Sequence, residues 1–250
     1  MAGNTGAPGA TVASRVLALL AAFDADHRAL TLSELARRAG LPAPTAHRLV
    51  RELVAAGFLV RRTGGEYVVG RRVWDIGLLA PVQSGLRQLA SPFLHDLYGA
   101  TLATVHLAVR DRTRALYVDR LAGSTSVPVV SQVGSRLPLH ATGVGKVLLA
   151  YAPAEVQEAV LTDLPRITPY TVTQPGILRE QLRRVHRDGF AQTVEEMSLG
   201  ACSVAVPVST VAGRVVAALG IVVPRIGRDR LRLVSALQVA ARGIGRSVEP

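Results

Sequence analysis

The feature that most constrains this chain is a short stretch carrying both the start and the stop signal of a helix. Thr31 and Glu34 have the spacing of a capping box, in which each side chain bonds the other residue's backbone N–H group. Gly40 suits the left-handed turn that commonly ends a helix. The sequence therefore predicts a helix over Thr31–Arg38 with a tight turn directly behind it.

A second helix is expected after this turn. Pro42 and Pro44 fit a first helical turn, where a missing amide proton costs little. The helical pattern then continues to Gly57, and another amphipathic helix over 11–24 precedes the pair. Two short helices around a glycine turn are typical of a helix-turn-helix, in which the second helix reads DNA.

A basic hairpin follows the helices. The β-prone runs 58–62 and 66–69 flank Thr63-Gly64-Gly65, a sequence that favours a tight turn. Arg61 and Arg62 lie on the first run, as in the wing of a winged helix-turn-helix. A plain three-helix module whose arginines only face water is the alternative, but the complete order of elements favours DNA binding.

The charge balance supports a polyanionic partner. The 250 residues carry a formal net charge of +11, and Lys146 is the single lysine among the 29 basic residues. We expect double-stranded DNA as the partner, read by base-edge and phosphate contacts. The predicted DNA-binding residues are Thr31, Ala43, Thr45, Ala46, His47, Arg48, Arg51, Arg61 and Arg62.

Other classes of protein find little support. Cys202 is the only cysteine, which excludes an internal disulfide framework and fits a reducing cytoplasm. No apolar run reaches membrane-spanning length, and residues 1–10 read as a frayed tail without signal-peptide order. The six histidines lack metal-ligand spacing. We therefore expect a cytoplasmic protein with no cofactor, metal or membrane partner.

The remainder of the chain predicts a second, mixed domain. A helix over 71–89, interrupted at Pro81, should connect the two domains and serve in a dimer contact. A new helix is expected from Ser91. Strand-like runs, helical patterns and a closing helix follow, and they are listed here by residue range: strands 103–110, 115–120, 127–133, 203–208 and 214–223; helices 142–151, 155–161, 177–187 and 229–247. The pattern indicates an α+β fold with an antiparallel sheet, and domains over 11–71, 72–90 (the linker helix) and 91–250.

Catalytic chemistry is weakly supported. The run from Thr142 to Lys146 lacks the spacing of a phosphate-binding loop and the hydroxyl residue that should follow its lysine. Glu195 and Glu196 are adjacent, so in an extended strand they point to opposite sides and cannot act as a pair. No catalytic residue is predicted, and we expect that the protein is not an enzyme.

At this point a family resemblance appears. The stretch from Gly134 to Ala150, GSRLPLHATGVGKVLLA, resembles the signature loop and helix of the IclR family of bacterial transcriptional regulators. So do Arg187-Asp188-Gly189-Phe190-Ala191 and Ser203-Val204-Ala205-Val206-Pro207-Val208, and Leu41-Pro42 with His47-Arg48-Leu49 resemble its recognition helix. The resemblance implies a winged helix-turn-helix, a linker helix and a GAF-like effector-binding domain. It also implies dimers or dimers of dimers on palindromic operators.

The resemblance further implies an effector site. Carried over position by position, the site comprises Val129, Gly143, Val144, Thr193, Ser203, Gly220 and Val222. Thr142 adds a hydroxyl beside these positions. His140 is also assigned to this site, with a purely structural role as the alternative. Many members have an acidic residue where this chain has Thr193, and acid-binding relatives have serines at Gly220 and Val222. The lining is therefore apolar with a few hydroxyls, which suits a hydrophobic or aromatic ligand with one polar handle, such as an organic or aromatic acid.

The expected function is ligand-controlled transcription, as a repressor of a catabolic or metabolic operon. Two alternatives stay open on the sequence alone. One is an enzyme whose second domain turns over its ligand, and the other is a constitutive architectural DNA-binding protein with an empty sensor domain.

Overall fold

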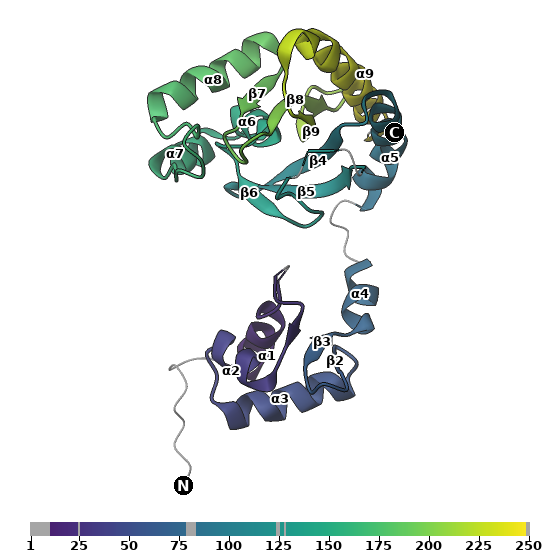
Figure 1. Cartoon of the computed structure of the whole chain (residues 1–250), viewed down its shortest axis with the longest axis vertical. Coiled ribbons are helices and arrows are strands. Elements are labelled where there is room, and N and C mark those ends of the chain that lie inside the picture. Colours follow the sequence, from purple (N-terminus) through teal and green to yellow (C-terminus); the bar gives the residue numbers. More distant parts are fainter. Residues whose placement is uncertain (1–10, 25, 79–83, 124–125, 128, 249–250) are drawn as a thin grey trace. The chain divides into compact units, whose positions relative to one another are not determined.

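The computed structural model describes residues 11–24, 26–78, 84–123, 126–127 and 129–248. The chain divides into two compact units, Met1–Val82 and Gln83–Pro250, which are described separately (Figure 1). The predicted tail over residues 1–10 and the predicted break at Pro81 lie outside the described residues.

The first unit holds four helices and three short strands among its described residues. They are α1 Val12–Ala21, β1 Ala29–Leu30, α2 Leu32–Arg38, α3 Ala43–Ala55, β2 Leu59–Arg61, β3 Tyr67–Val69 and α4 Arg71–Leu78. The capping box is present at α2, where Oγ1 of Thr31 accepts from the Glu34 N–H group and the Glu34 carboxylate accepts from the Thr31 N–H group. Gly40 has a φ of 64°, as the predicted turn requires.

The predicted wing is confirmed, with one strand added. β2 and β3 pair antiparallel, and β1 joins the outer side of β3 through Ala29 and Leu30. Sequence reasoning missed β1 because two residues carry no periodicity. A single apolar cluster joins α1, α2 and α3 to this sheet. Its buried members include Leu19, Leu30, Leu35, Ala46, Leu49, Val50, Leu53, Leu59 and Tyr67.

The second unit is built on one six-stranded antiparallel sheet. Its strands are β4 Thr104–Asp111, β5 Arg114–Leu121, β6 Arg136–Pro138, β7 Ala191–Val194, β8 Cys202–Ser209 and β9 Val215–Val223, in the order β6-β5-β4-β9-β8-β7. Its helices are α5 Ser84–Thr101, α6 Gly143–Ala150, α7 Ala154–Thr162, α8 Pro175–Asp188 and α9 Arg230–Val248, with a short 3-10 turn, η1 Gly227–Asp229. The predicted α+β class is thus confirmed.

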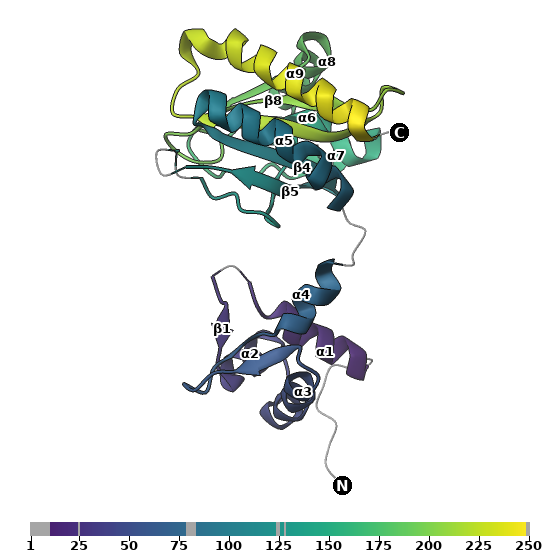
Figure 2. The ribbon, with the colours of Figure 1, turned by 90° about the vertical axis from the view of Figure 1, so that its right-hand side faces the viewer.

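Helices cover both faces of the sheet. α5 and α9 pack together on one face, where alternate residues such as Leu107, Val204 and Leu219 enter a shared core (Figure 2). α6, α7 and α8 cover the other face, which receives Ala108, Ala205 and other small side chains. Since side chains of a strand alternate between faces, each central strand contributes to both cores.

Two local predictions were wrong. The helix expected to start at Ser91 begins at Ser84, so the expected domain boundary at residues 90/91 falls inside α5. A continuous apolar stripe of Leu86, Ala90, Leu94 and Leu97 packs on the core, and this burial outweighs the helix-breaking effect of Pro92.

The second error concerns the strand expected over 127–133. Those of its residues that the structure describes form bends and turns, and the edge strand is β6, nearer the helix that follows. Val130 and Val133 are exposed. The β-branched residues of this run therefore do not indicate a strand paired in the sheet. The sequence also gave no sign of β6 or β7, each of which has four residues or fewer.

Candidate functional site

The exposed side of α3 carries the predicted DNA-reading residues. Its inner side buries Leu49, Val50 and Leu53, which fixes the direction of the outer side. Ala43, His47, Arg48 and Arg51 are exposed, and Thr45 is half-buried. Ala46 is 0% exposed and belongs to the core, so its prediction as a DNA contact was wrong. The helical period turns it inward with Leu49 and Val50.

The arginines around this face are held by weak local contacts. Nη1 of Arg48 lies 3.0 Å from Oε1 of Glu52, one helical turn away, with both side chains exposed. The guanidinium of Arg61 sits 5.9 Å from the ring centre of Tyr67, while Arg62 is exposed beside it. Such contacts are worth little in water, so these cations can exchange them for phosphate. Thr31 is exposed, and its hydroxyl is used in the α2 cap.

A cavity in the second unit collects the predicted effector residues. It has a volume of about 480 Å³, counting its open mouth, and it lies between the sheet and the start of α6. Eight of the nine predicted residues line it: Val129, Thr142, Gly143, Val144, Thr193, Ser203, Gly220 and Val222. The cavity brings together β7, β8, β9, α6 and the segment before β6, which are distant in sequence.

The ninth residue, His140, does not belong to this cavity. It lines a separate depression with Arg114 and Asp163, and its Nε2 atom lies 3.0 Å from the Pro165 carbonyl oxygen. Burial lowers the pKa of His140, although the contact with Pro165 opposes that shift. Its assignment to the effector site was therefore wrong. The chain turns between His140 and the cap residue Thr142, which directs the two side chains to different places.

The N-terminus of α6 forms one wall of the cavity. Thr142 caps the helix, with Oγ1 accepting from the Gly145 N–H group at 3.1 Å. Within the described residues, no hydrogen bond is formed by the amide N–H groups of Gly143 and Val144. Free amides at a helix N-terminus attract anions. Gly143 is needed here because a Cβ atom would lie 2.5 Å from Oγ of Ser203.

A hydroxyl pair borders the same wall. Thr193 on β7 and Ser203 on β8 face each other directly in the sheet, and their hydroxyl oxygens are 2.6 Å apart. Thr193 is buried and Ser203 half-buried. Each hydroxyl has hydrogen-bonding capacity left for a ligand. Together with the α6 amides, this end of the cavity suits a carboxylate.

A second polar group, which sequence reasoning missed, comes from β4, β5 and the segment before β6. His106, Tyr117 and Ser131 all line the cavity. Nε2 of His106 lies 2.8 Å from Oγ of Ser131, and its ring meets that of Tyr117 edge to face at 4.9 Å between centroids. Burial lowers the pKa of His106 to about 3, with a smaller contribution from Arg120. The imidazole is therefore neutral at physiological pH.

A β-bulge assembles this group. The pairing of β4 with β5 shifts between Leu107 and Ala108, so Ala108 faces Tyr117 while His106 faces Arg120. Tyr117 and Arg120 are three residues apart and would point to opposite faces of a regular strand. The bulge brings both to the side of His106. Burial raises the pKa of Tyr117 to about 12, although a hydrogen bond with Thr142 opposes the rise.

Behind the cavity lies a buried ion pair. Nζ of Lys146 is 2.5 Å from Oε1 of Glu196, and the two residues are 1% and 5% exposed. Burial lowers the pKa of Lys146 and raises that of Glu196, while their attraction opposes both shifts. Glu196 therefore has a structural role and is paired with Lys146 rather than with Glu195. Glu195 has a φ of 53° and accepts from the Gly200 N–H group at 2.5 Å.

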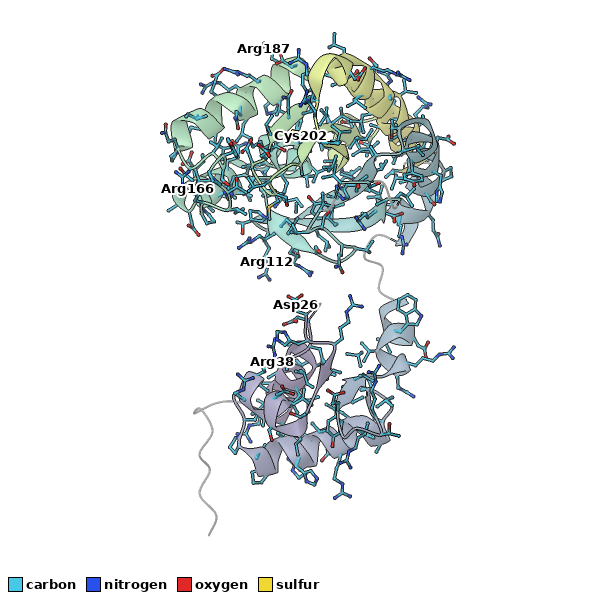
Figure 3. All side chains as sticks on the ribbon, viewed as in Figure 1. Asp26, Arg38, Arg112, Arg166, Arg187 and Cys202 are labelled. Atoms are coloured by element: carbon cyan, nitrogen blue, oxygen red, sulfur yellow. The ribbon has the colours of Figure 1, made fainter. Side chains whose placement is uncertain are left out.

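The remaining candidates show no reactive arrangement. Cys202 lies inside the second unit, and burial raises the pKa of its thiol (Figure 3). Across the part of the chain that the structure describes, no three histidine, cysteine or acidic side chains gather as a metal site. In that same part, no helix combines the length and apolar character needed to cross a membrane.

Comparison with known proteins places both units in one class of regulator. Residues 12–63 match the IclR helix-turn-helix domain, and residues 80–246 match the C-terminal domain of the bacterial transcriptional regulator IclR. The helix-turn-helix and the effector-type domain thus define a DNA-binding transcriptional regulator rather than an enzyme. The chain belongs to the IclR family.

Individual relatives align along nearly the whole chain. The glycerol operon regulatory protein of Streptomyces coelicolor is 32% identical, covering 94% of each chain. The transcriptional repressor AllR of Salmonella typhi is 32% identical over 90% of this chain and 85% of its own. An IclR homologue from Microbacterium hydrocarbonoxydans, solved with 4-hydroxybenzoate, is 36% identical with a TM-score of 0.90, covering 95% of this chain and 99% of that one.

Proposed function

We propose that this regulator is a repressor whose affinity for operator DNA is controlled by a small aromatic acid. The observation that carries the proposal is the cavity itself, which has an apolar middle and a polar wall at the N-terminus of α6. The relative crystallised with 4-hydroxybenzoate supports this choice of ligand class. The target would be a catabolic or metabolic operon, and the protein would act in the bacterial cytoplasm, bound to the nucleoid.

The carboxylate of such a ligand would meet the amides of Gly143 and Val144 and the hydroxyls of Thr193 and Ser203. Free N–H groups at a helix end and nearby hydroxyls stabilise an anion without a formal cation. The ring would contact Val129, Val222 and their apolar neighbours. We propose these contacts as the effector site.

Operator DNA would be bound by the exposed face of α3 and by the wing. Thr45 and His47 are proposed to reach base edges in the major groove, and Arg48 and Arg51 to hold phosphates or a guanine. Arg61 and Arg62 would contact the backbone beside this groove. Ala43 and Thr31, at the starts of α3 and α2, are proposed to approach the DNA backbone.

Assembly as a homodimer, or as a dimer of dimers, would present two reading helices to a palindromic operator. Support comes from exposed apolar residues on α4 and α1. Trp74, the only tryptophan of the chain, is 65% exposed, and Ile76, Val12 and Leu17 are also exposed. Burying a large exposed aromatic side chain is favourable, and such residues are enriched at protein interfaces.

Fluorescence anisotropy with labelled DNA tests the proposal directly. The full-length protein is titrated onto the promoter region beside its own gene, and then 4-hydroxybenzoate or benzoate is added. Specific binding should weaken by about 5–150-fold with ligand, the usual range of allosteric coupling. Equal affinity for the promoter and for unrelated DNA would contradict the DNA-binding proposal. Affinity unchanged by ligand, together with no shift in thermal unfolding, would contradict the effector proposal.

A further inference from the structure

The cavity has a second polar end, opposite the wall formed by the helix N-terminus and the hydroxyl pair. His106 lies directly across from Gly220 on the neighbouring strand, whereas Ser203 lies across from Val222, two residues along. Thr193 is one strand farther out. Neighbouring strands lie about 4.8 Å apart, and three such spacings separate β4 from β7. The backbones of His106 and Thr193 are therefore about 14 Å apart across the sheet. A ligand held at the Thr193 end therefore extends toward His106.

The two polar ends differ in charge preference. At the His106 end, the polar atoms facing the cavity belong to the neutral imidazole and the Ser131 hydroxyl, whereas the Tyr117 hydroxyl is hydrogen-bonded to Thr142 at the start of α6. Arg120 lies across from His106 in the sheet but is not part of the cavity lining. A carboxylate placed there would be desolvated with neither a cation nor free helix amides in the cavity lining, since Arg120 acts on His106 from outside that lining. A neutral group avoids this penalty.

We infer that His106 and Ser131 form a recognition site for a hydroxyl group of the effector, at the end of the molecule opposite its carboxylate. The inference rests on the proposed function and adds which end of the effector binds at which end of the cavity. The His106–Ser131 hydrogen bond runs one way or the other according to the imidazole tautomer. In either case, the Ser131 hydroxyl retains hydrogen-bonding capacity toward a ligand. A phenolic hydroxyl, which can both donate and accept, fits this pair.

Isothermal titration calorimetry of the full-length protein with benzoate and 4-hydroxybenzoate tests the inference. The wild type should bind 4-hydroxybenzoate roughly tenfold more tightly than benzoate, the effect of one well-formed hydrogen bond. Ser131→Ala and His106→Phe should reduce this ratio to about one. The ratio of the two affinities is the measured quantity, because a change in cavity shape at either residue would affect the binding of both acids.

The matched control is Thr193→Ala at the opposite end. It should weaken both ligands by a similar factor and leave their ratio near the wild-type value. A ratio that persists in Ser131→Ala and His106→Phe, or a wild type that binds the two acids equally, would overturn the inference while the proposed function stands. Failure of both acids to bind the wild type would overturn the proposed function together with it. Ser131 lies outside the sheet, so its variant keeps the test available if His106→Phe does not fold.

Discussion

Lys146 and Glu196 form an ion pair that is almost completely removed from solvent, with 2.5 Å between Nζ and Oε1. Lys146 belongs to α6, whose first residues line the cavity, and Glu196 precedes Met197 and Ser198, which line it from another side. The hydroxyls of Thr168 and Thr171 donate to the carbonyl oxygens of Glu195 and Glu196, both at 2.7 Å. The pair therefore ties two walls of the cavity together.

Breaking this pair should destabilise the second unit strongly. Lys146→Met leaves a buried carboxylate without its partner, and we expect the free energy of unfolding to fall by about 3–5 kcal/mol. The double variant Lys146→Met/Glu196→Leu should recover most of that loss, because no uncompensated charge remains. Urea denaturation followed by circular dichroism measures the free energy of unfolding of the single and the double variant. The exposed pair Arg179–Glu158 is the control, and Arg179→Met should cost less than about 1 kcal/mol. A fully stable Lys146→Met protein would contradict this account.

The neutral His106 predicts a specific pH dependence. Its pKa is about 3 in the folded protein, against 6.5 for an unperturbed histidine. Between these values the unfolded chain binds a proton that the folded protein excludes, so stability is complete above about pH 6.5 and falls as the pH is lowered toward 3. The slope should reach about 1.4 kcal/mol per pH unit.

Comparing the wild type with His106→Gln isolates the contribution of His106 to the pH dependence of stability. The carboxylates contribute equally to the stability curves of both proteins. Urea denaturation at a series of pH values should show the two stabilities approaching each other as the pH falls. His95→Gln, at an exposed position of α5, is the control for the loss of a histidine outside the cavity. If the stability curves of His106→Gln and the wild type ran parallel, the pKa of His106 would not be lowered in the folded protein, and this prediction would be contradicted.

Gly143 should be required for the effector response. In Gly143→Ala the new methyl group would lie 2.5 Å from Oγ of Ser203, so the Ser203 hydroxyl must move away from its position beside Thr193 and the cavity wall changes. We expect ligand affinity to fall at least about tenfold while operator binding is retained, since α3 lies in the other unit. Gly176→Ala is the control, because its methyl group would meet open space at the start of α8. Equal effects of the two substitutions on ligand binding would refute the assignment of this wall.

Arg48 should contribute to operator affinity through charge. Arg48→Ala is expected to weaken binding and to reduce the salt dependence by about one unit of slope, as for one lost phosphate contact. The comparison uses anisotropy titrations at several salt concentrations. Arg183→Ala is matched in design, since Arg183 is an exposed α8 residue paired with Glu180 as Arg48 is with Glu52. If both variants lost the same affinity and slope, α3 would not be the reading helix.

The exposed α4 residues predict a dimer that can be followed through one fluorophore. Trp74 is the single tryptophan, so its emission should shift to longer wavelength when the protein is diluted below its dimer dissociation constant. Ile76→Asp should move this transition to higher concentration, because it places a charge in the apolar contact. Val211→Asp, at a 75% exposed position of the β8–β9 turn, should leave it unchanged. A monomeric wild type at all concentrations in analytical ultracentrifugation would contradict the assembly.

Elements whose signals are local could be predicted from the amino-acid sequence alone. The capping box of Thr31 and Glu34, the turn at Gly40 and the glycine hairpin each depend on residues within a few positions of one another. Nine effector-site residues were predicted from the sequence, and eight of them line the cavity. The ninth, His140, lies elsewhere, because a motif does not give the direction of each side chain.

The His106 end of the cavity depends on how distant segments pack, and the sequence did not predict it. His106, Tyr117 and Ser131 come from separate segments, and a bulge in one strand pairing brings two of them to the same face. The buried partnership of Lys146 with Glu196 spans 50 residues and has no local signature. A periodic pattern reports which face of an element is buried, but not which distant strand lies beside it. The groups that distinguish one effector from another therefore emerge only when the sheet is assembled.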